Sequence, residues 1–395
     1  MISRHHWLLL SVITTFALLS RAGHAQVLDF VETGETCPAT IGCQVAVQPH
    51  DAPVPADACN SEDPVTVTVS GERLMLSVRA PDRPQFVSGS LSTQRLEPVG
   101  DGCWAAAWRL PYLSGSKLTF TAFDAQSRTL GRAVFEGAAS GSGVDYAELS
   151  ADIETVTLND TIAGIERRVH VYAPPQMNSA PVPVLILPDG QAIRQYARIV
   201  QDLINSEHVP PLLIIAIEAR MDTPFARSND YVPQPDTDHH RAYLTFFEDE
   251  FIAWIEARYR GQVTQEGWLI FGASASATFA LTASRTSSPI DHIIAASPGA
   301  TDVDIFDEPP ARDVAFHISA GLYEEEFQHA AARYSEQLRA QGAPVRRYCY
   351  YSGHDLFTWE AALRDALVEI FGGRSLSDLA AQGAPCPGMV SEPAP

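Results

Sequence analysis

The chain has 395 residues and a formal net charge of -21 at pH 7, with 48 acidic and 27 basic side chains. A charge of this size and sign argues against nucleic acid or an anionic membrane surface as a partner. The only lysine is Lys117 and no G-x-x-x-x-G-K pattern occurs, so Schiff-base catalysis and a phosphate-binding loop of that kind are disfavoured. A chain of this length is expected to hold about two domains.

Residues 1–25 have the pattern of a secretory signal peptide. Arg4 precedes an apolar run from Trp7 to Leu19, and small residues lead up to Gln26, where the mature chain would begin. The run is shorter than the roughly 20 residues that span a bilayer. The sequence therefore predicts a periplasmic or secreted protein with no membrane association after cleavage; an uncleaved anchor is the alternative.

Six cysteines in an exported chain predict disulfide bonds. Proximity along the chain favours three pairs: Cys37 with Cys43, Cys59 with Cys103, and Cys349 with Cys386. Six cysteines allow 15 connectivities, so this pairing is one of several. None lies in a C-x-x-C motif, and the spacings fit neither a metal site nor a thiol nucleophile.

Residues 26–140 read as an all-β domain. Short alternating runs are separated by Gly, Pro and Ser; they cover residues 65–69, 74–78, 103–110 and 117–123. Trp104, Ala106 and Trp108 share one strand face. The pattern predicts an immunoglobulin-like β-sandwich stabilised by disulfides, preceded by a Pro-rich segment. Gly and Ser dominate residues 137–144, which are interpreted as a linker.

Residues 145–372 show a different pattern, in which apolar strand-like runs alternate with helix-length segments. The runs cover residues 167–173, 183–187, 211–217, 268–271, 291–296, 314–319 and 345–351. Such interleaving predicts a largely parallel sheet with helices on both faces, an α/β fold. Residues 241–259 form a predicted helix with Leu244, Phe247, Phe251 and Ile255 on its core face. Residues 373–395 are interpreted as a C-terminal tail.

The segment 267–280 reads as a buried strand that turns sharply into a small-residue helix. Gly272 permits the turn, and Ser274 lies at the bend, where a hydrolase would hold its nucleophile. The helix N-terminus would face a developing oxyanion. Ser276 stands where this motif usually has a second glycine.

A serine nucleophile needs a base, and the base needs an orienting acid. In an α/β-hydrolase the three follow in the order serine, acid, histidine, each after a strand. His354 follows the run that ends at residue 351 and is the predicted base. Glu324 follows the run that ends near Ala320 and is the predicted acid, with Glu325 as the alternative.

Two backbone N–H groups are needed to bind the oxyanion. Ala275 directly follows the nucleophile, and Gln191 lies in the loop after another predicted strand, so these two are the predicted donors.

Asp236, Asp238, His239 and His240 invite comparison with a metal site. Their spacing matches no known ligand set, and an acidic loop that caps the following helix is the more ordinary interpretation. Neither a metal nor a cofactor is predicted.

Five local motifs, in order, carry a resemblance to a known family. They are Leu187-Pro188-Asp189-Gly190-Gln191, Arg227-Ser228-Asn229-Asp230-Tyr231, Gly272-Ala273-Ser274, Gly321-Leu322-Tyr323-Glu324, and Gly353-His354-Asp355 followed by Trp359. Together they resemble the "putative esterase" group of α/β-hydrolases, which includes enterochelin esterase, esterase D, S-formylglutathione hydrolase and the antigen 85 mycolyltransferases. The resemblance implies the same roles for Ser274, His354 and Glu324, with Gln191 and Ala275 as oxyanion donors. The preceding β-domain also looks like the one in enterochelin esterase.

The leading hypothesis is an exported serine esterase that acts on a small-molecule or glycan ester. Siderophore esters of the enterochelin kind fit the domain order, and Arg227 and Arg220 are candidate groups for binding an anionic substrate; Arg227 as a structural partner of Asp230 is the alternative. A feruloyl or acetyl polysaccharide esterase, an acyltransferase, and a non-catalytic binding protein on the same scaffold remain alternative functions.

Overall fold

The computed structural model describes residues 48–372, apart from 50–57, 60, 72, 85, 90–95, 101, 111–112, 114–115, 127, 138–147, 224, 235–237, 302–303, 308 and 351. The predicted signal peptide, the linker and the C-terminal tail lie wholly or almost wholly outside these residues, so the predicted domain boundaries stay predictions. No helix in the described part of the chain is long and apolar enough to cross a membrane.

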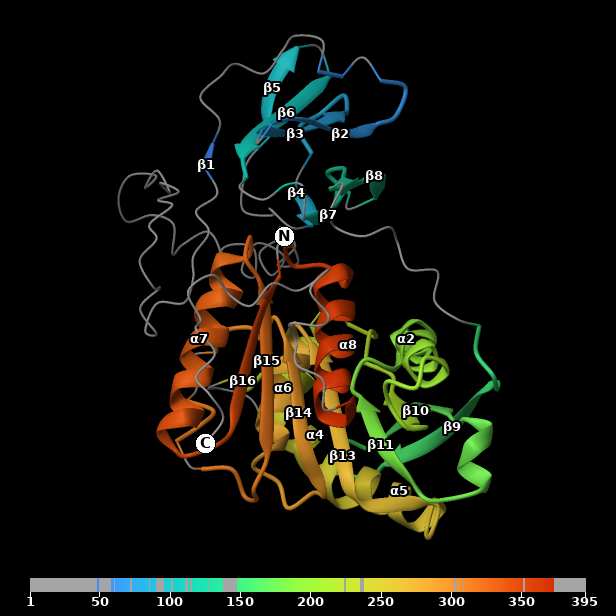
Figure 1. Ribbon diagram of the computed structural model, residues 1–395. Helices are drawn as coiled ribbons and strands as arrows, with labels where there is room; N and C mark the ends of the chain where they lie inside the picture. The colour runs from blue at the N-terminus through green and yellow to red at the C-terminus, as the bar shows by residue number, and fades with distance from the viewer. Residues whose placement is uncertain are drawn as a thin grey trace.

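The N-terminal part consists of two antiparallel sheets (Figure 1). One has the order β1-β6-β3-β2 with β5 added on β6, and the other has the order β4-β7-β8. The strands are β1 Gln48–Pro49, β2 Val65–Ser70, β3 Arg73–Arg79, β4 Phe86–Gly89, β5 Glu97–Gly100, β6 Cys103–Arg109, β7 Lys117–Phe123 and β8 Thr129–Glu136. All four predicted strands are present. The immunoglobulin-like assignment stays a prediction.

Buried side chains of both sheets meet in one cluster. Trp108 is almost fully buried and stacks against Phe120 of the other sheet. A disulfide joins Cys59 to Cys103, as predicted. Cys349 is also disulfide-bonded. The predicted pairs Cys37–Cys43 and Cys349–Cys386 involve residues outside the described part.

The second part is built on an eight-stranded sheet with the order β16-β15-β14-β13-β11-β12-β10-β9. Its strands are β9 Ile153–Asp160, β10 Ile165–Tyr172, β11 Val182–Leu187, β12 Leu213–Ile217, β13 Val263–Ala273, β14 Ile290–Ala296, β15 Ala315–Gly321 and β16 Val345–Tyr350. The six strands from β11 onward pair in parallel, and β10 and β9 add antiparallel pairs at one edge. The sheet and its helices fit an α/β-hydrolase-like fold.

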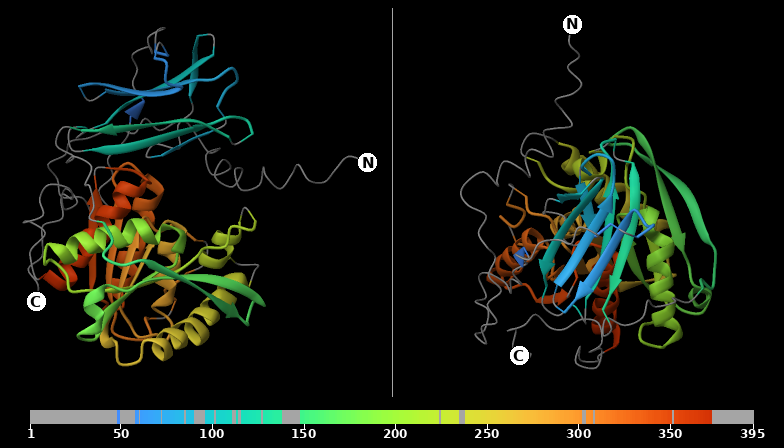
Figure 2. Two further views of the ribbon diagram at one scale, coloured as in Figure 1. Left: turned by 90° about the vertical axis from the view of Figure 1, so that its right-hand side faces the viewer. Right: turned by 90° about the horizontal axis from the view of Figure 1, so that it is seen from above.

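Helices cover both faces of this sheet (Figure 2). The elements are η4 Pro175–Asn178, η5 Gly190–Ala192, α2 Ile193–Asn205, α3 Ala226–Tyr231, α4 His239–Phe246, η6 Phe247–Ile252, α5 Ala253–Arg258, α6 Ala275–Ala283, α7 Glu325–Ala340 and α8 Leu356–Gly372. The buried residues of α2 and α8 pack on one face. Those of α4, η6, α5, α6 and α7 pack on the other.

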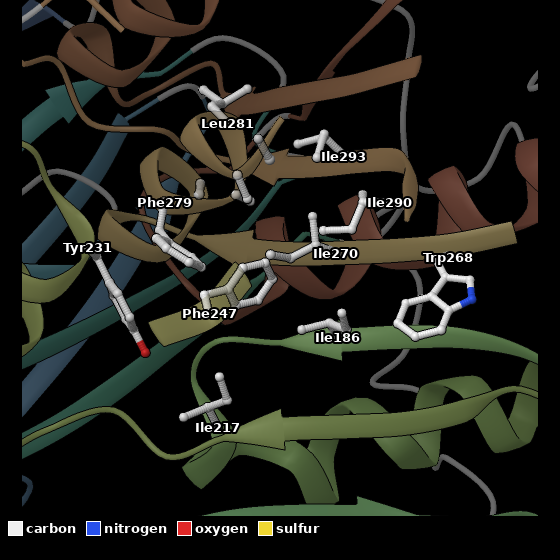
Figure 3. Packing of buried hydrophobic residues seen from close by; sticks show 14 of the residues in the cluster. Ile186, Ile217, Tyr231, Phe247, Trp268, Ile270, Phe279, Leu281, Ile290 and Ile293 are labelled. Carbon is white, nitrogen blue, oxygen red and sulfur yellow. The ribbon is translucent and has the colours of Figure 1, made fainter. Parts of the chain in front are cut away.

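The larger core explains why the strands read as continuous apolar runs. Ile186, Ile217, Ile270 and Ile293 come from four neighbouring strands, and Phe279 of α6 belongs to the same cluster, beside Phe247 and Tyr231 (Figure 3). Strands buried on both faces need apolar side chains at nearly every position. The strand predictions therefore succeeded where both faces are covered.

Two elements of the second part differ from expectation. Strand β9 was not predicted, because it lies at the sheet edge and, up to the buried Asp160, carries only partly buried or exposed side chains. The predicted helix 241–259 exists, but it contains a π-helical stretch over Phe247–Ile252 between α4 and α5. The wider turn still leaves Phe247, Phe251 and Ile255 buried, so the predicted core face holds there.

Candidate active site

Ser274 lies at a sharp bend between β13 and α6. Its backbone has φ 60° and ψ -125°, a conformation that non-glycine residues rarely adopt. Such strain persists only where the surroundings enforce it, and it is concentrated at functional sites. Gly272 is part of that enforcement, since a Cβ there would lie 2.0 Å from the carbonyl oxygen of Ser276.

The structure brings Ser274, His354 and Glu324 into one hydrogen-bonded row. His354 Nδ1 lies 2.6 Å from Glu324 Oε2, and His354 Nε2 lies 3.0 Å from Ser274 Oγ. An ionised carboxylate only accepts, so Nδ1 carries the proton and Nε2 is left to accept from the serine hydroxyl. The three side chains come from loops after β13, β15 and β16, which end at the same edge of the parallel sheet.

The Glu324 carboxylate is buried, with 2% of its side chain exposed. Its Oε1 accepts hydrogen bonds from the Ser297 hydroxyl at 2.6 Å and from the Gly321 N–H. Trp359 Nε1 in turn donates to Ser297 Oγ at 3.1 Å. Both carboxylate oxygens thus have donors, and this fixes the orientation in which Oε2 faces His354.

Two aromatic rings enclose the His354 imidazole. Phe327 stacks on it with ring centroids 3.9 Å apart and an interplanar angle of 24°. Trp359 meets it edge-on, at 5.2 Å and 87°. A ring held in this way has little freedom to rotate away from Ser274 and Glu324.

Sequence reasoning missed Ser297 and Phe327. Ser297 directly follows β14 at the active edge of the sheet, which was a usable signal. It also has a positive φ of 52°. Phe327 carried no signal, since a single aromatic residue on a helix is usually core.

The two predicted oxyanion donors come from two different helical elements. Ala275 is the first residue of α6, where a backbone N–H has no acceptor within the helix. Gln191 lies in η5, which Pro188 and Asp189 connect to the end of β11. Tyr231 fixes the loop between β11 and η5, because its hydroxyl donates to the Pro188 carbonyl. Burial raises the pKa of Tyr231, so the hydroxyl keeps its proton. The roles of Ala275 and Gln191 stay predictions.

Ser276 is buried within this arrangement. Its Oγ accepts from the Ala273 N–H at 2.8 Å and lies 2.6 Å from Asp189 Oδ2. The side chain therefore packs without opening the turn, and it makes polar contacts that a glycine could not make.

Both candidate substrate-binding arginines are already paired with carboxylates. Arg227 donates from Nε and Nη2 to the two oxygens of Asp189, each at 2.7 Å. Burial lowers the pKa of Arg227, but Asp189 more than offsets this, so the net shift is upward. Arg220 pairs with Asp222 at 2.9 Å and lies 3.6 Å from Asp230.

The alternative that Arg227 pairs with Asp230 is wrong. Asp230 instead receives a hydrogen bond of 3.0 Å from Arg167, which comes from β10. The reason is positional: α3 turns Arg227 toward the β11 loop and the Asp230 side chain toward β10. The sequence motif could not distinguish these directions.

Of the acidic and histidine cluster at the start of α4, Asp236 lies outside the described residues. Asp238 pairs with Arg241 at 2.6 Å, and the buried His240 donates from Nδ1 to the Asp230 carbonyl at 3.0 Å. Burial lowers the pKa of His240 to about 4. These contacts account for Asp238 and His240 without a ligand.

The acid and base loops also contact the N-terminal sheets. Leu322, Tyr323 and Cys349 belong to the buried cluster of those sheets. The hydroxyl of Ser352, two residues before His354, donates to the Lys117 carbonyl at 2.7 Å. The N-terminal part thus packs directly against the loops that carry Glu324 and His354.

A model of the family described as "Putative esterase" matches residues 161–370, just over half of the chain. The chain belongs to this family. It is therefore a carboxylic ester hydrolase, and the matched region contains the whole hydrogen-bonded row of Ser274, His354 and Glu324.

Solved structures support the fold of this esterase. Enterobactin esterase from Shigella flexneri, in the presence of enterobactin, is 12% identical with a TM-score of 0.58, and the match covers 82% of this chain and 98% of that one. The same enzyme in the presence of 2,3-di-hydroxy-N-benzoyl-glycine gives 14% identity, coverage of 81% and 98%, and a TM-score of 0.56. No curated protein matches the chain.

Proposed function

We propose that the chain is an exported serine esterase in which Ser274 is the nucleophile, His354 the general base and Glu324 the orienting acid. The row from Glu324 Oε2 through His354 to Ser274 Oγ carries this proposal, with separations of 2.6 Å and 3.0 Å. The bend at Ser274 supports it, because the strained backbone exposes Oγ beside the N-terminus of α6.

In the first half-reaction, His354 Nε2 takes the Ser274 proton as Oγ attacks the ester carbonyl carbon. The N–H groups of Ala275 and Gln191 bind the negative oxygen of the tetrahedral intermediate. The intermediate collapses when the carbon–oxygen bond to the alcohol breaks, and His354 gives its proton to the leaving alcohol. Glu324 holds the imidazolium by accepting from Nδ1.

In the second half-reaction, a water molecule loses a proton to His354 and attacks the acyl-enzyme. The bond to Ser274 Oγ then breaks, the serine regains its proton, and the carboxylic acid leaves. An alcohol in place of the water would make the same steps an acyl transfer, so product analysis with and without an added sugar acceptor distinguishes the two reactions.

The test is hydrolysis of a p-nitrophenyl ester by the wild type and by Ser274→Ala. Loss of the nucleophile is expected to lower kcat by about 10⁶-fold. A fluorophosphonate should label the wild type covalently and leave the variant unlabelled. Unchanged turnover in Ser274→Ala would reject the triad, and an unlabelled, inactive wild type would favour a non-catalytic binding protein.

For the substrate, we propose catecholate siderophore esters of the enterobactin type. The support is the similar arrangement of the two chains: the match covers 98% of the enterobactin esterase chain, so it includes the N-terminal part of that enzyme. We also infer that the two N-terminal sheets form an immunoglobulin-like sandwich, as their common buried cluster suggests. Export is inferred from residues 1–25 and from the Cys59–Cys103 disulfide.

One observation favours a second candidate, an esterase for neutral aromatic or acetyl esters of polysaccharides. Arg227 is committed to Asp189, and Arg220 to Asp222 and Asp230, so neither guanidinium presents an unpaired charge to an anionic ferric catecholate. A hydrolysis panel of ferric and iron-free catecholate esters against feruloyl and acetyl sugars separates the two candidates. Faster turnover of the sugar esters would favour the polysaccharide esterase over the siderophore esterase.

A further inference from the structure

The serine two residues after the nucleophile links the bend at Ser274 to the loop after β11. Ser276 is 1% exposed, and its Oγ accepts from the Ala273 N–H at 2.8 Å. Its own proton has two acceptors in reach, Asp189 Oδ2 at 2.6 Å and the Ala273 carbonyl at 2.9 Å. The carboxylate is closer and charged, which makes it the stronger acceptor.

Asp189 is held from its other side by Arg227. The guanidinium donates in parallel to both carboxylate oxygens, and Nη2 also lies 3.1 Å from the Ala273 carbonyl. The contacts therefore close a ring through Ala273, Ser276, Asp189 and Arg227. A bidentate pair of this kind fixes direction as well as distance.

The residues that follow Asp189 have little freedom once Asp189 is fixed. Gly190 lies against the end of β12, where a Cβ would come within 2.6 Å of the Glu218 nitrogen. The Gln191 side chain accepts from the Ala219 N–H at 3.1 Å. The backbone N–H of Gln191 thus sits in a segment anchored on one side by β12 and on the other by Ser276 and Arg227.

We propose that Ser276 is a positioning residue: through Asp189 and Arg227 it sets the distance between the Ser274 nucleophile and the oxyanion donor at Gln191. The inference rests on the proposed function, since it requires Ser274 to be acylated. A glycine at this position allows close packing by its small size alone. Ser276 instead makes two hydrogen bonds, and its hydroxyl thereby joins the bend that carries Ala275 to the loop that carries Gln191.

The test compares Ser276→Ala and Ser276→Gly with Ser284→Ala. Ser284 is a matched control, because it is a buried serine that directly follows the same helix, and its hydroxyl donates to the Leu281 carbonyl at 2.7 Å. We expect both Ser276 variants to lose about 10- to 100-fold in kcat, as for a displacement of order 1 Å. KM and the pH midpoint of kcat should stay at wild-type values, since neither substrate binding nor His354 is altered.

Labelling by fluorophosphonate gives a readout independent of the ester. Ser274 Oγ bonds to phosphorus as His354 Nε2 takes its proton, the phosphorus–fluorine bond breaks and fluoride leaves, and the developing negative oxygen occupies the oxyanion site. The labelling rate should fall by the same factor as kcat. If Ser276→Ala does not fold, Ser276→Gly decides, since glycine is the residue that this motif usually carries there.

The variant Asp189→Asn tests whether Ser276 acts on the oxyanion site through Asp189. If Ser276 acts through Asp189, the double variant Ser276→Ala with Asp189→Asn should be no slower than Asp189→Asn alone. Three outcomes would overturn the proposal. They are wild-type kcat and labelling rate in both Ser276 variants, a loss of kcat in Ser284→Ala equal to that in Ser276→Ala, and a double variant whose loss of kcat is the product of the two single losses. Failure of the proposed function differs from all of these, because Ser274→Ala would then retain activity.

Discussion

The Tyr323 hydroxyl lies 2.7 Å from Ser116 Oγ, and both groups are buried between the N-terminal sheets and the esterase region. Tyr323 directly precedes Glu324, so the loop that carries the proposed acid is hydrogen-bonded to the N-terminal part. Lys117, the next residue after Ser116, has its Nζ 4.1 Å from the centre of the Phe357 ring, at the start of α8. The N-terminal sheets therefore support both the acid loop and the segment that follows His354.

This contact predicts that Tyr323→Phe and Ser116→Ala destabilise the chain through the same hydrogen bond. Each should lower the free energy of unfolding by about 0.5–1.5 kcal/mol, the net value of a hydrogen bond. The double variant should be little worse than either single variant. Thermal unfolding of the four proteins measures this, and fully additive losses would show that the two residues do not interact.

The contacts of Glu324 predict a large catalytic effect for Glu324→Gln. The amide can present its NH₂ group to His354 and so favour the wrong tautomer, and we expect kcat to fall by roughly 10³- to 10⁴-fold. Glu326→Gln is the control, because Glu326 is exposed on α7. Steady-state kinetics on one ester compares them, and equal activities of the two variants would remove Glu324 from the acid role.

The sequence was sufficient to predict most of the sheet and the chain order of the candidate site. Buried parallel strands appear as apolar runs, and the bend at Ser274 is a local pattern of strand, glycine and small-residue helix. The strands that were missed lie at edges or are short, as β9, β4 and β5 do, and their burial depends on neighbours that no local pattern reveals.

The contacts around the site could not be predicted in the same way. Pairing of Arg227 with Asp189 depends on the loops after β11 and β12 lying side by side, which follows from the sheet order. Stacking of Phe327 on His354 depends on how α7 packs against the end of β16. Ser276 was noticed only as a departure from a motif, and its partner Asp189 is 87 positions away.

The disulfide between Cys59 and Cys103 predicts a stability difference for the N-terminal sheets. It links residues 44 positions apart, and a bond that closes a loop of this size typically contributes about 2–4 kcal/mol. Replacing both cysteines by serine should lower the free energy of unfolding of the N-terminal part by this amount, and the denaturant midpoint should fall accordingly. Urea unfolding followed by tryptophan fluorescence measures it, since Trp104 and Trp108 lie in these sheets; an unchanged midpoint would contradict the prediction.

His317 predicts a loss of stability in acid. Burial, with the nearby His292 and Arg346, lowers its pKa to about 3, and its Nδ1 lies 2.9 Å from the Tyr348 hydroxyl. Below about pH 6.5 this histidine is protonated in the unfolded chain but stays neutral in the folded chain. Stability is therefore lost as pH falls from about 6.5 toward about 3, by several kcal/mol, because one pKa unit corresponds to about 1.4 kcal/mol.

Replacing His317 by phenylalanine keeps a flat ring against Tyr348 and removes the titration, so the variant should lose less stability than the wild type between pH 6.5 and pH 4. Other buried groups act in the same range: His240 adds to the acid loss, whereas Asp365, whose pKa burial raises to about 6, opposes it. Both are common to the two proteins and cancel in the comparison. Equal slopes of unfolding free energy against pH in the wild type and His317→Phe would show that this histidine does not govern acid stability.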